Sequence, residues 1–161
     1  MTIQAKSPNV SEMQPAQRAG KFLFWQRWLV VVSLALTAFG LFMAFFNRTP
    51  LFNLLFNHQI DPVFWGSAEV PPGAAAFQGW IYGVLGAVIA GWGTFLIFIA
   101  AHPFKQREKW AWNCILAGLL VWYVIDTFIS LQFKVVFNAI LNTALFIPMI
   151  LPLVFTRKDF E

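Results

Sequence analysis

One carboxylate, Asp126, lies inside an apolar stretch that is long enough to cross a bilayer. The stretch runs from about Trp110 to Leu131, and about 20 apolar residues suffice for a membrane helix. A charged side chain at the centre of such a helix costs about 2.5–3.5 kcal/mol on insertion scales, so it usually marks a functional site or a specific partner. No other acidic or basic residue occurs in the spanning segments that the sequence predicts.

Polar residues at helical spacing accompany Asp126. Residues four apart share one face of a helix, and a tight hairpin between the third and fourth spans would bring the polar residues of both helices to a similar depth. Asp126 itself lies about 9 Å below the outer end of its span, at 1.5 Å per residue. The sequence therefore predicts a ligand-binding polar cluster in the outer half of the bundle, formed by Asp126, Thr127, Ser130, Asn138 and Asn142, with Trp122 at its apolar end.

Two interpretations of this cluster remain open. In the first it is structural, because Asn, Ser and Thr side chains bond across membrane helices at ~0.6 kcal/mol per contact, and Lys134 can extend toward Asp126 as a counter-charge. In the second it binds a polar or cationic group. General acid–base chemistry would need a second titratable group nearby, for which His58, Asp61 and Glu69 are the candidates. No catalytic residue is assigned, and whether the protein is an enzyme stays open.

The sequence identifies neither a metal site nor a cofactor. His58 and His102 fall on opposite sides of the membrane, and the single cysteine, Cys114, forms no Cys-x-x-Cys motif. Trp92 and Trp122 fall near the middle of their spans. They either line an apolar pocket for an isoprenoid, sterol-like or quinone tail or simply pack in the bundle.

Composition indicates which elements must position these residues. The chain has 161 residues, of which 59% are hydrophobic and 11% charged, and its mean hydropathy is +0.66. A soluble domain carries about 25% charged residues, so lipid must be the solvent for most of this chain. The predicted fold is an all-α integral membrane protein, a four-transmembrane-helix bundle with a short interfacial helix in its first outer loop. The net charge of +4 forms no basic stripe, which argues against nucleic-acid binding.

Four apolar runs define a single membrane domain over residues 25–156. The expected spans are 28–46, 79–101, 110–131 and 135–155. Residues 1–24 are polar and predict a disordered cytoplasmic tail, and residues 157–161 form a second cytoplasmic tail. The first run begins late and lacks a small-residue cleavage site, which predicts an uncleaved helix rather than a signal peptide.

The basic residues predict the orientation. Nine Lys and Arg residues lie before the first span, in the 102–109 loop and after the fourth span, against two, Arg48 and Lys134, on the other side. The positive-inside rule therefore places both termini in the cytoplasm and the protein in the inner (plasma) membrane.

The first outer loop, 47–78, is long enough to contain structure of its own. Pro50 suits the first turn of a helix, and Pro62 disfavours helical geometry at the residue before it, so the helix should end at Asp61. Asn53, Asn57 and Asp61 form its polar face. The loop is either a shield for the helix ends or a lid that controls access to the polar cluster.

Small residues recur every four positions in the second span, at Gly79, Gly83, Ala87 and Gly91. Such a row lets helix backbones approach closely, either within the bundle or against a membrane-protein partner or a second copy.

This layout of helices, long outer loop and outer-half acid resembles that of DoxX-like bacterial membrane proteins and of four-helix lipid-binding isomerases. The resemblance is one of architecture and assigns no residue a role. Two functions follow from the residues. One is a non-catalytic accessory subunit of a larger membrane complex that docks through the glycine row. The other is a binder or enzyme for a lipidic ligand, with its polar site at Asp126, Asn138 and Asn142.

Overall fold

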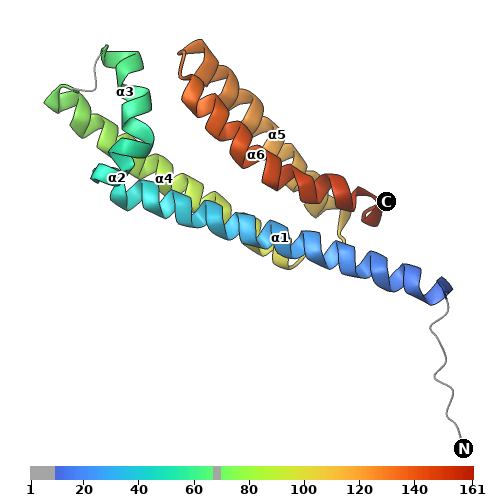
Figure 1. Ribbon diagram of the computed structural model, residues 1–161. Coiled ribbons are helices and arrows are strands. Elements are labelled where there is room, and N and C mark those ends of the chain that lie inside the picture. Colours follow the sequence, from blue (N-terminus) through green and yellow to red (C-terminus); the bar gives the residue numbers. More distant parts are fainter. Residues whose placement is uncertain (1–9, 67–69) are drawn as a thin grey trace, which may run out of the picture.

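Four long helices make up most of the chain. The computed structural model describes residues 10–66 and 70–161, and these are all-helical, with four helices long and apolar enough to span a membrane. They are α1 (Val10–Phe46), α4 (Pro72–Ala101), α5 (Lys109–Gln132) and α6 (Val136–Thr156). The predicted four-helix membrane fold, with a short helical segment between the first two spans, is confirmed (Figure 1).

Helix α1 begins earlier than the sequence suggested. Residues 10–24, expected to belong to a disordered tail, are helical, while residues 1–9 of that tail lie outside the described part of the chain. Extending an existing helix adds one backbone hydrogen bond for each residue fixed, so an apolar span can propagate into a polar flank. The flank here is rich in Gln, Ala, Arg and Lys, which are good helix formers.

The helices associate as two pairs. Helix α1 packs along α4, α5 packs along α6, and α1 also contacts α6, whereas α4 and α5 barely touch. The pairs meet near the C-terminus and diverge toward the α5–α6 turn (Figure 1). We call the converging end, with loop 102–108 and the C-terminal turn, the basic end, and the diverging end, with residues 47–66 and 133–135, the hairpin end.

Glycine brings α1 and α4 into close contact. A Cβ atom at Gly40, Gly86 or Gly93 would lie within 3 Å of backbone atoms of the facing helix, so only glycine fits. The row predicted from the sequence lies one residue away on the helix surface. Ala87 and Gly91 are exposed, with nothing near the missing Cβ of Gly91. The other two members of that row, Gly83 and Gly79, lie near Ala44 and the Arg48 side chain respectively.

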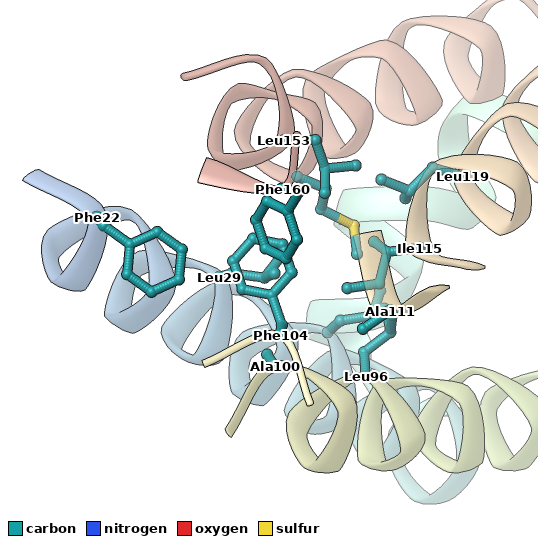
Figure 2. Packing of buried hydrophobic residues seen from close by; sticks show 12 residues of the cluster. Phe22, Leu29, Leu96, Ala100, Phe104, Ala111, Ile115, Leu119, Leu153 and Phe160 are labelled. Atoms are coloured by element: carbon teal, nitrogen blue, oxygen red, sulfur yellow. The ribbon is translucent and has the colours of Figure 1, made fainter. Parts of the chain in front are cut away.

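Apolar side chains fill the basic end. Phe104, Ala100, Ile115 and Leu153 are at most 2% exposed, and they belong to a cluster to which every spanning helix contributes (Figure 2). Phe104 stacks on Phe22, folding the α4–α5 loop over this cluster. The basic end is therefore closed by a continuous core.

Two tryptophans bond to backbone carbonyls of α6, which contains Pro148 and Pro152. Proline has no backbone N–H, so Pro152 leaves the carbonyl of Pro148 without its helical partner. The Trp28 indole donates to that carbonyl at 2.9 Å, and Trp112 donates to the carbonyl of Leu153 at 2.9 Å. Neighbouring helices thus satisfy carbonyls that α6 itself does not.

Residues 50–65, between α1 and α4, form a continuous helix with a wider central turn: α2 (Pro50–Phe52), a π-helix (Asn53–Asn57) and α3 (His58–Trp65). Thr49 caps it, with Pro50 in the first turn as predicted. The helix does not end at Asp61. It passes through Pro62 and stops at Gly66, whose φ of 68° provides the left-handed cap that ends many helices.

Candidate functional site

The Asp126 carboxylate accepts hydrogen bonds from Asn138 and Trp122. Asn138 Nδ2 donates to Oδ1 at 2.9 Å, and Trp122 Nε1 donates to Oδ2 at 3.2 Å. The Ser130 hydroxyl donates to the backbone carbonyl of Asp126 at 2.7 Å and lies 3.2 Å from Oδ1. Asn138 Nδ2 also lies 2.8 Å from Ser130 Oγ. The four residues form one connected network, which we call the Asp126 cluster.

The α5–α6 turn fixes the geometry of this cluster. The N–H of Val135 bonds to the carbonyl of Ser130 and the N–H of Lys134 to that of Leu131, which is the pattern of a Schellman motif. Lys134 occupies the left-handed position with φ of 61°. This turn sets Asn138 of α6 opposite Ser130 and Asp126 of α5. Further along the pair, Tyr123 Oη lies 3.1 Å from Thr143 Oγ1.

Two predicted members of the cluster stand apart from the network. Asn142 is 3% exposed, and its Nδ2 has no hydrogen-bond partner in the described part of the chain. The same holds for the buried Oγ1 of Thr127. Asn142 lies one turn beyond Asn138 and lines the adjacent cavity, whereas Thr127 does not. Burying an unsatisfied polar group costs about 1–3 kcal/mol, so the Asn142 amide needs a partner.

A cavity of about 880 Å³ lies between the two helix pairs. Sites for small molecules typically enclose 300–1,000 Å³ and are mostly apolar, with a few placed polar groups. This cavity has that character, because aliphatic and aromatic side chains dominate its wall. Its polar lining consists of Asp126, Ser130, Asn138, Asn142, Gln78 and Tyr82.

The cavity is closed toward the basic end and open at its side. Trp92 of α4 and Trp122 of α5 lie in contact, with ring centroids 5.7 Å apart. Beyond them the apolar core begins. Val88 of α4 and Val121 of α5 both line the cavity and remain 63% and 59% exposed. The opening therefore lies between α4 and α5 and faces the membrane interior.

The segment α2–α3 covers the hairpin end of the cavity with aromatic side chains. Phe56 lies 6.0 Å from Phe137, and Phe64 lies 6.3 Å from Phe133, measured between ring centroids. Both Phe56 and Phe64 line the cavity. In Figure 1, α3 stands in the gap between the diverging pairs.

The three polar residues predicted as a lid point elsewhere. Asp61 is 5% exposed and accepts a hydrogen bond from Gln78 Nε2 of α4 at 2.6 Å. Asn57 Nδ2 donates to Asn53 Oδ1 at 2.5 Å, and both residues line a second, smaller pocket rather than the large cavity. The aromatic face of α2–α3, and not its polar face, is thus turned toward the Asp126 cluster.

The chemistry available in the cavity is recognition by hydrogen bonding. Among the described residues that line it, Asp126 and Tyr82 are the titratable side chains. His58 is exposed and Asp61 does not line the cavity, while Glu69 lies outside the described residues. The Asp126 carboxylate accepts hydrogen bonds and the free Asn142 amide donates them, so a ligand hydroxyl can bond to both. A ligand carbonyl can bond to the Asn142 amide alone.

Sequence reasoning missed Gln78, Tyr82 and the aromatic lining. The predicted span begins at residue 79 and leaves Gln78 in the loop, whereas α4 begins at Pro72. The available signal is the four-residue spacing of Gln78 and Tyr82, which places both residues on one helix face. From this face Gln78 donates to Asp61. Comparison with protein families, with curated proteins and with solved structures finds no match to this chain.

Proposed function

We propose that the protein binds a lipidic molecule in the cavity between its helix pairs. A hydroxyl or carbonyl group of the ligand accepts from Asn142 and, if it is a hydroxyl, donates to Asp126. The observation that carries this proposal is the Asn142 amide, which is buried, lines an apolar cavity and has no partner among the described residues. A ligand oxygen would satisfy it and recover the desolvation cost.

The apolar part of the ligand occupies the space between Trp92, Trp122 and the aromatic face of α2–α3. Aromatic rings provide large rigid surfaces for such contacts. The lateral opening between α4 and α5 lets the ligand enter from the bilayer, and long chains can extend back into it. Since no second titratable side chain of the described chain is hydrogen-bonded to the Asp126 carboxylate, the proposal is one of binding rather than of an assigned reaction.

We also propose that the basic end faces the cytoplasm of a cell whose inner membrane holds the protein. The helices gather eight of the described basic residues at the basic end, and cytoplasmic flanks carry the excess of Lys and Arg. In this orientation both termini are cytoplasmic and the cavity lies in the outer half of the bilayer.

Lipid retention tests the binding proposal. The protein is purified in mild detergent, and co-purified lipid is quantified by mass spectrometry for the native chain, Asn142→Ala and Asp126→Asn. We expect one lipid class to be retained near stoichiometry and to fall at least fivefold in Asn142→Ala. Asn113→Ala, at an exposed position of the same helix pair, is the matched control and should retain the lipid. Equal retention by Asn142→Ala and the native chain would refute the proposal.

A second candidate is an accessory subunit that docks on α4. The exposed Ala87 and Gly91 lie on a face that α1 does not cover, and no atom of a neighbouring helix lies near the missing Cβ of Gly91. A partner helix, or a second copy, could approach closely there. Gly91→Leu should then abolish co-purification of the partner while leaving lipid retention intact. A native chain that is monomeric and partner-free in mild detergent would count against this candidate.

A further inference from the structure

A second pocket adjoins the cavity at the hairpin end. It encloses about 390 Å³ between the end of α1, the π-helix and the start of α4. We call it the Arg48 pocket. Its polar lining consists of Asn47, Arg48, Asn53, Asn57, Gln78 and Tyr82. A charged and amide-rich wall distinguishes it from the apolar cavity beside it.

The amides of this pocket are held in place. Asn47 Nδ2 donates to the carbonyls of Met43 and Ala44 at 2.9 and 3.2 Å, and Asn57 Nδ2 donates to Asn53 Oδ1. Asn57 is 9% exposed, and its Oδ1 has no partner among the described residues. This oxygen is a buried acceptor on the pocket wall, so a ligand there should bring a hydrogen-bond donor.

The Arg48 guanidinium rests on the backbone of α4. A Cβ atom at Gly79 would lie 2.8 Å from Arg48 Nε and 3.0 Å from Nη2, so the missing side chain of Gly79 makes room for the cation. No carboxylate of the described chain lies within ion-pair distance of Arg48. The nearby acid Asp61 is bonded to Gln78 and does not line the pocket.

Gln78 and Tyr82 line both the Arg48 pocket and the large cavity, so the two spaces share a wall. An amphiphile that passes between these two side chains can lie with its apolar chain in the cavity and its headgroup against Arg48. Guanidinium binds phosphate through paired hydrogen bonds, while the free Asn57 oxygen requires a donor on the same headgroup.

We infer that the Arg48 pocket binds the headgroup of a phospholipid whose phosphate pairs with Arg48 and whose hydroxyl or ammonium substituent donates to Asn57 Oδ1. This inference rests on the proposed function, because the acyl chain of the same molecule occupies the cavity and its ester carbonyl accepts from Asn142. It adds the ligand class: a phospholipid whose headgroup carries a donor, such as a phosphoglycerol or phosphoethanolamine lipid.

Native mass spectrometry in detergent tests this with three probes that share or lack parts of the ligand. They are dioleoyl phosphatidylglycerol, dioleoylglycerol and sodium phosphate. We expect the native chain to prefer phosphatidylglycerol to dioleoylglycerol by at least tenfold. Arg48→Gln should reduce the preference to within twofold without lowering dioleoylglycerol binding, and Asn57→Ala should reduce it in the same direction. Lys134→Gln removes the other described cation of the hairpin end and should leave the preference intact.

The outcomes separate the two proposals. The headgroup inference is overturned if the native chain binds the two lipids equally, or if both Arg48→Gln and Asn57→Ala keep the full preference for phosphatidylglycerol. Either result leaves lipid binding through Asn142 in place. Displacement of phosphatidylglycerol by millimolar sodium phosphate overturns the assignment to a lipid headgroup, because the pocket then takes free phosphate. Failure of the native chain to bind either lipid overturns both proposals.

Discussion

The bond between Trp28 and the Pro148 carbonyl makes a quantitative prediction about α6. Pro152 deprives this carbonyl of its helical donor, and the Trp28 indole replaces that donor at 2.9 Å. Hydrogen bonds between membrane helices average about 0.6 kcal/mol and reach about 1.7, and an unsatisfied carbonyl costs about 1–3 kcal/mol. Trp28→Phe should therefore lower the free energy of unfolding by about 1–2 kcal/mol.

Pro152→Ala provides the test, because it restores an N–H that can bond to the Pro148 carbonyl within the helix. In the Pro152→Ala background, the loss of unfolding free energy caused by Trp28→Phe should be about 1 kcal/mol smaller. A double-mutant cycle cancels the packing changes of each single substitution. The assay is equilibrium unfolding by SDS titration in mixed micelles.

Trp112→Phe is the matched control for this cycle. Its indole bonds to the Leu153 carbonyl, which Pro152 does not affect, so its cost should be the same in both backgrounds. If Trp28→Phe costs the same with Pro152 and with Ala at that position, the indole does not compensate for the proline and the reasoning is refuted.

Three further predictions concern packing, the turn and the orientation. Gly86→Leu should destabilise the protein by more than about 3 kcal/mol in the same unfolding assay, because its side chain would meet the backbone of α1. Gly91→Leu, in open space, should change the free energy of unfolding by less than about 0.5 kcal/mol. Similar losses of stability at both positions would contradict the close contact of α1 and α4 at Gly86. Lys134→Gly should stabilise the fold by about 1 kcal/mol, because glycine accepts the left-handed φ of 61° without strain; a loss of stability would contradict this. In a cysteine-free background, Gln106→Cys should be protected from a membrane-impermeant maleimide in intact cells, whereas Gln59→Cys should react, and the reverse pattern would invert the proposed orientation.

The fold, and the proximity of Asp126 to its neighbours on α5 and α6, can be predicted from the sequence because both depend on local patterns. Apolar run length defines each span. The four-residue spacing of Trp122, Asp126 and Ser130, with a short turn before Asn138, places these side chains together in the structure as the sequence suggested. Helical periodicity and a tight turn leave little freedom at such a site.

What the sequence does not determine is how the helices face one another. Two rows of small residues on the second span differ by only one residue in register, and the choice of Gly86 over Ala87 depends on where Gly40 of α1 lies. The divergence of the helix pairs, and with it the cavity, depends on contacts at the basic end between segments far apart in the chain. Likewise, α3 continues through Pro62 to Trp65, although the local pattern ends the helix at Asp61.

Helix α1 is too long for the membrane it crosses. Its 37 residues extend about 55 Å at 1.5 Å per residue, against a hydrocarbon thickness of about 30 Å. With Phe46 at the hairpin-end interface, about 20 residues suffice for the crossing. Phe22 still packs on Phe104 in the core of the basic end, so the helix before Phe22 projects from the bundle as a rigid rod. Arg18 and Lys21 lie on this rod and are exposed. Each can contribute about 1 kcal/mol of attraction to anionic lipid when it lies near the surface, so the tilt of α1 becomes sensitive to the charge of the leaflet beneath it.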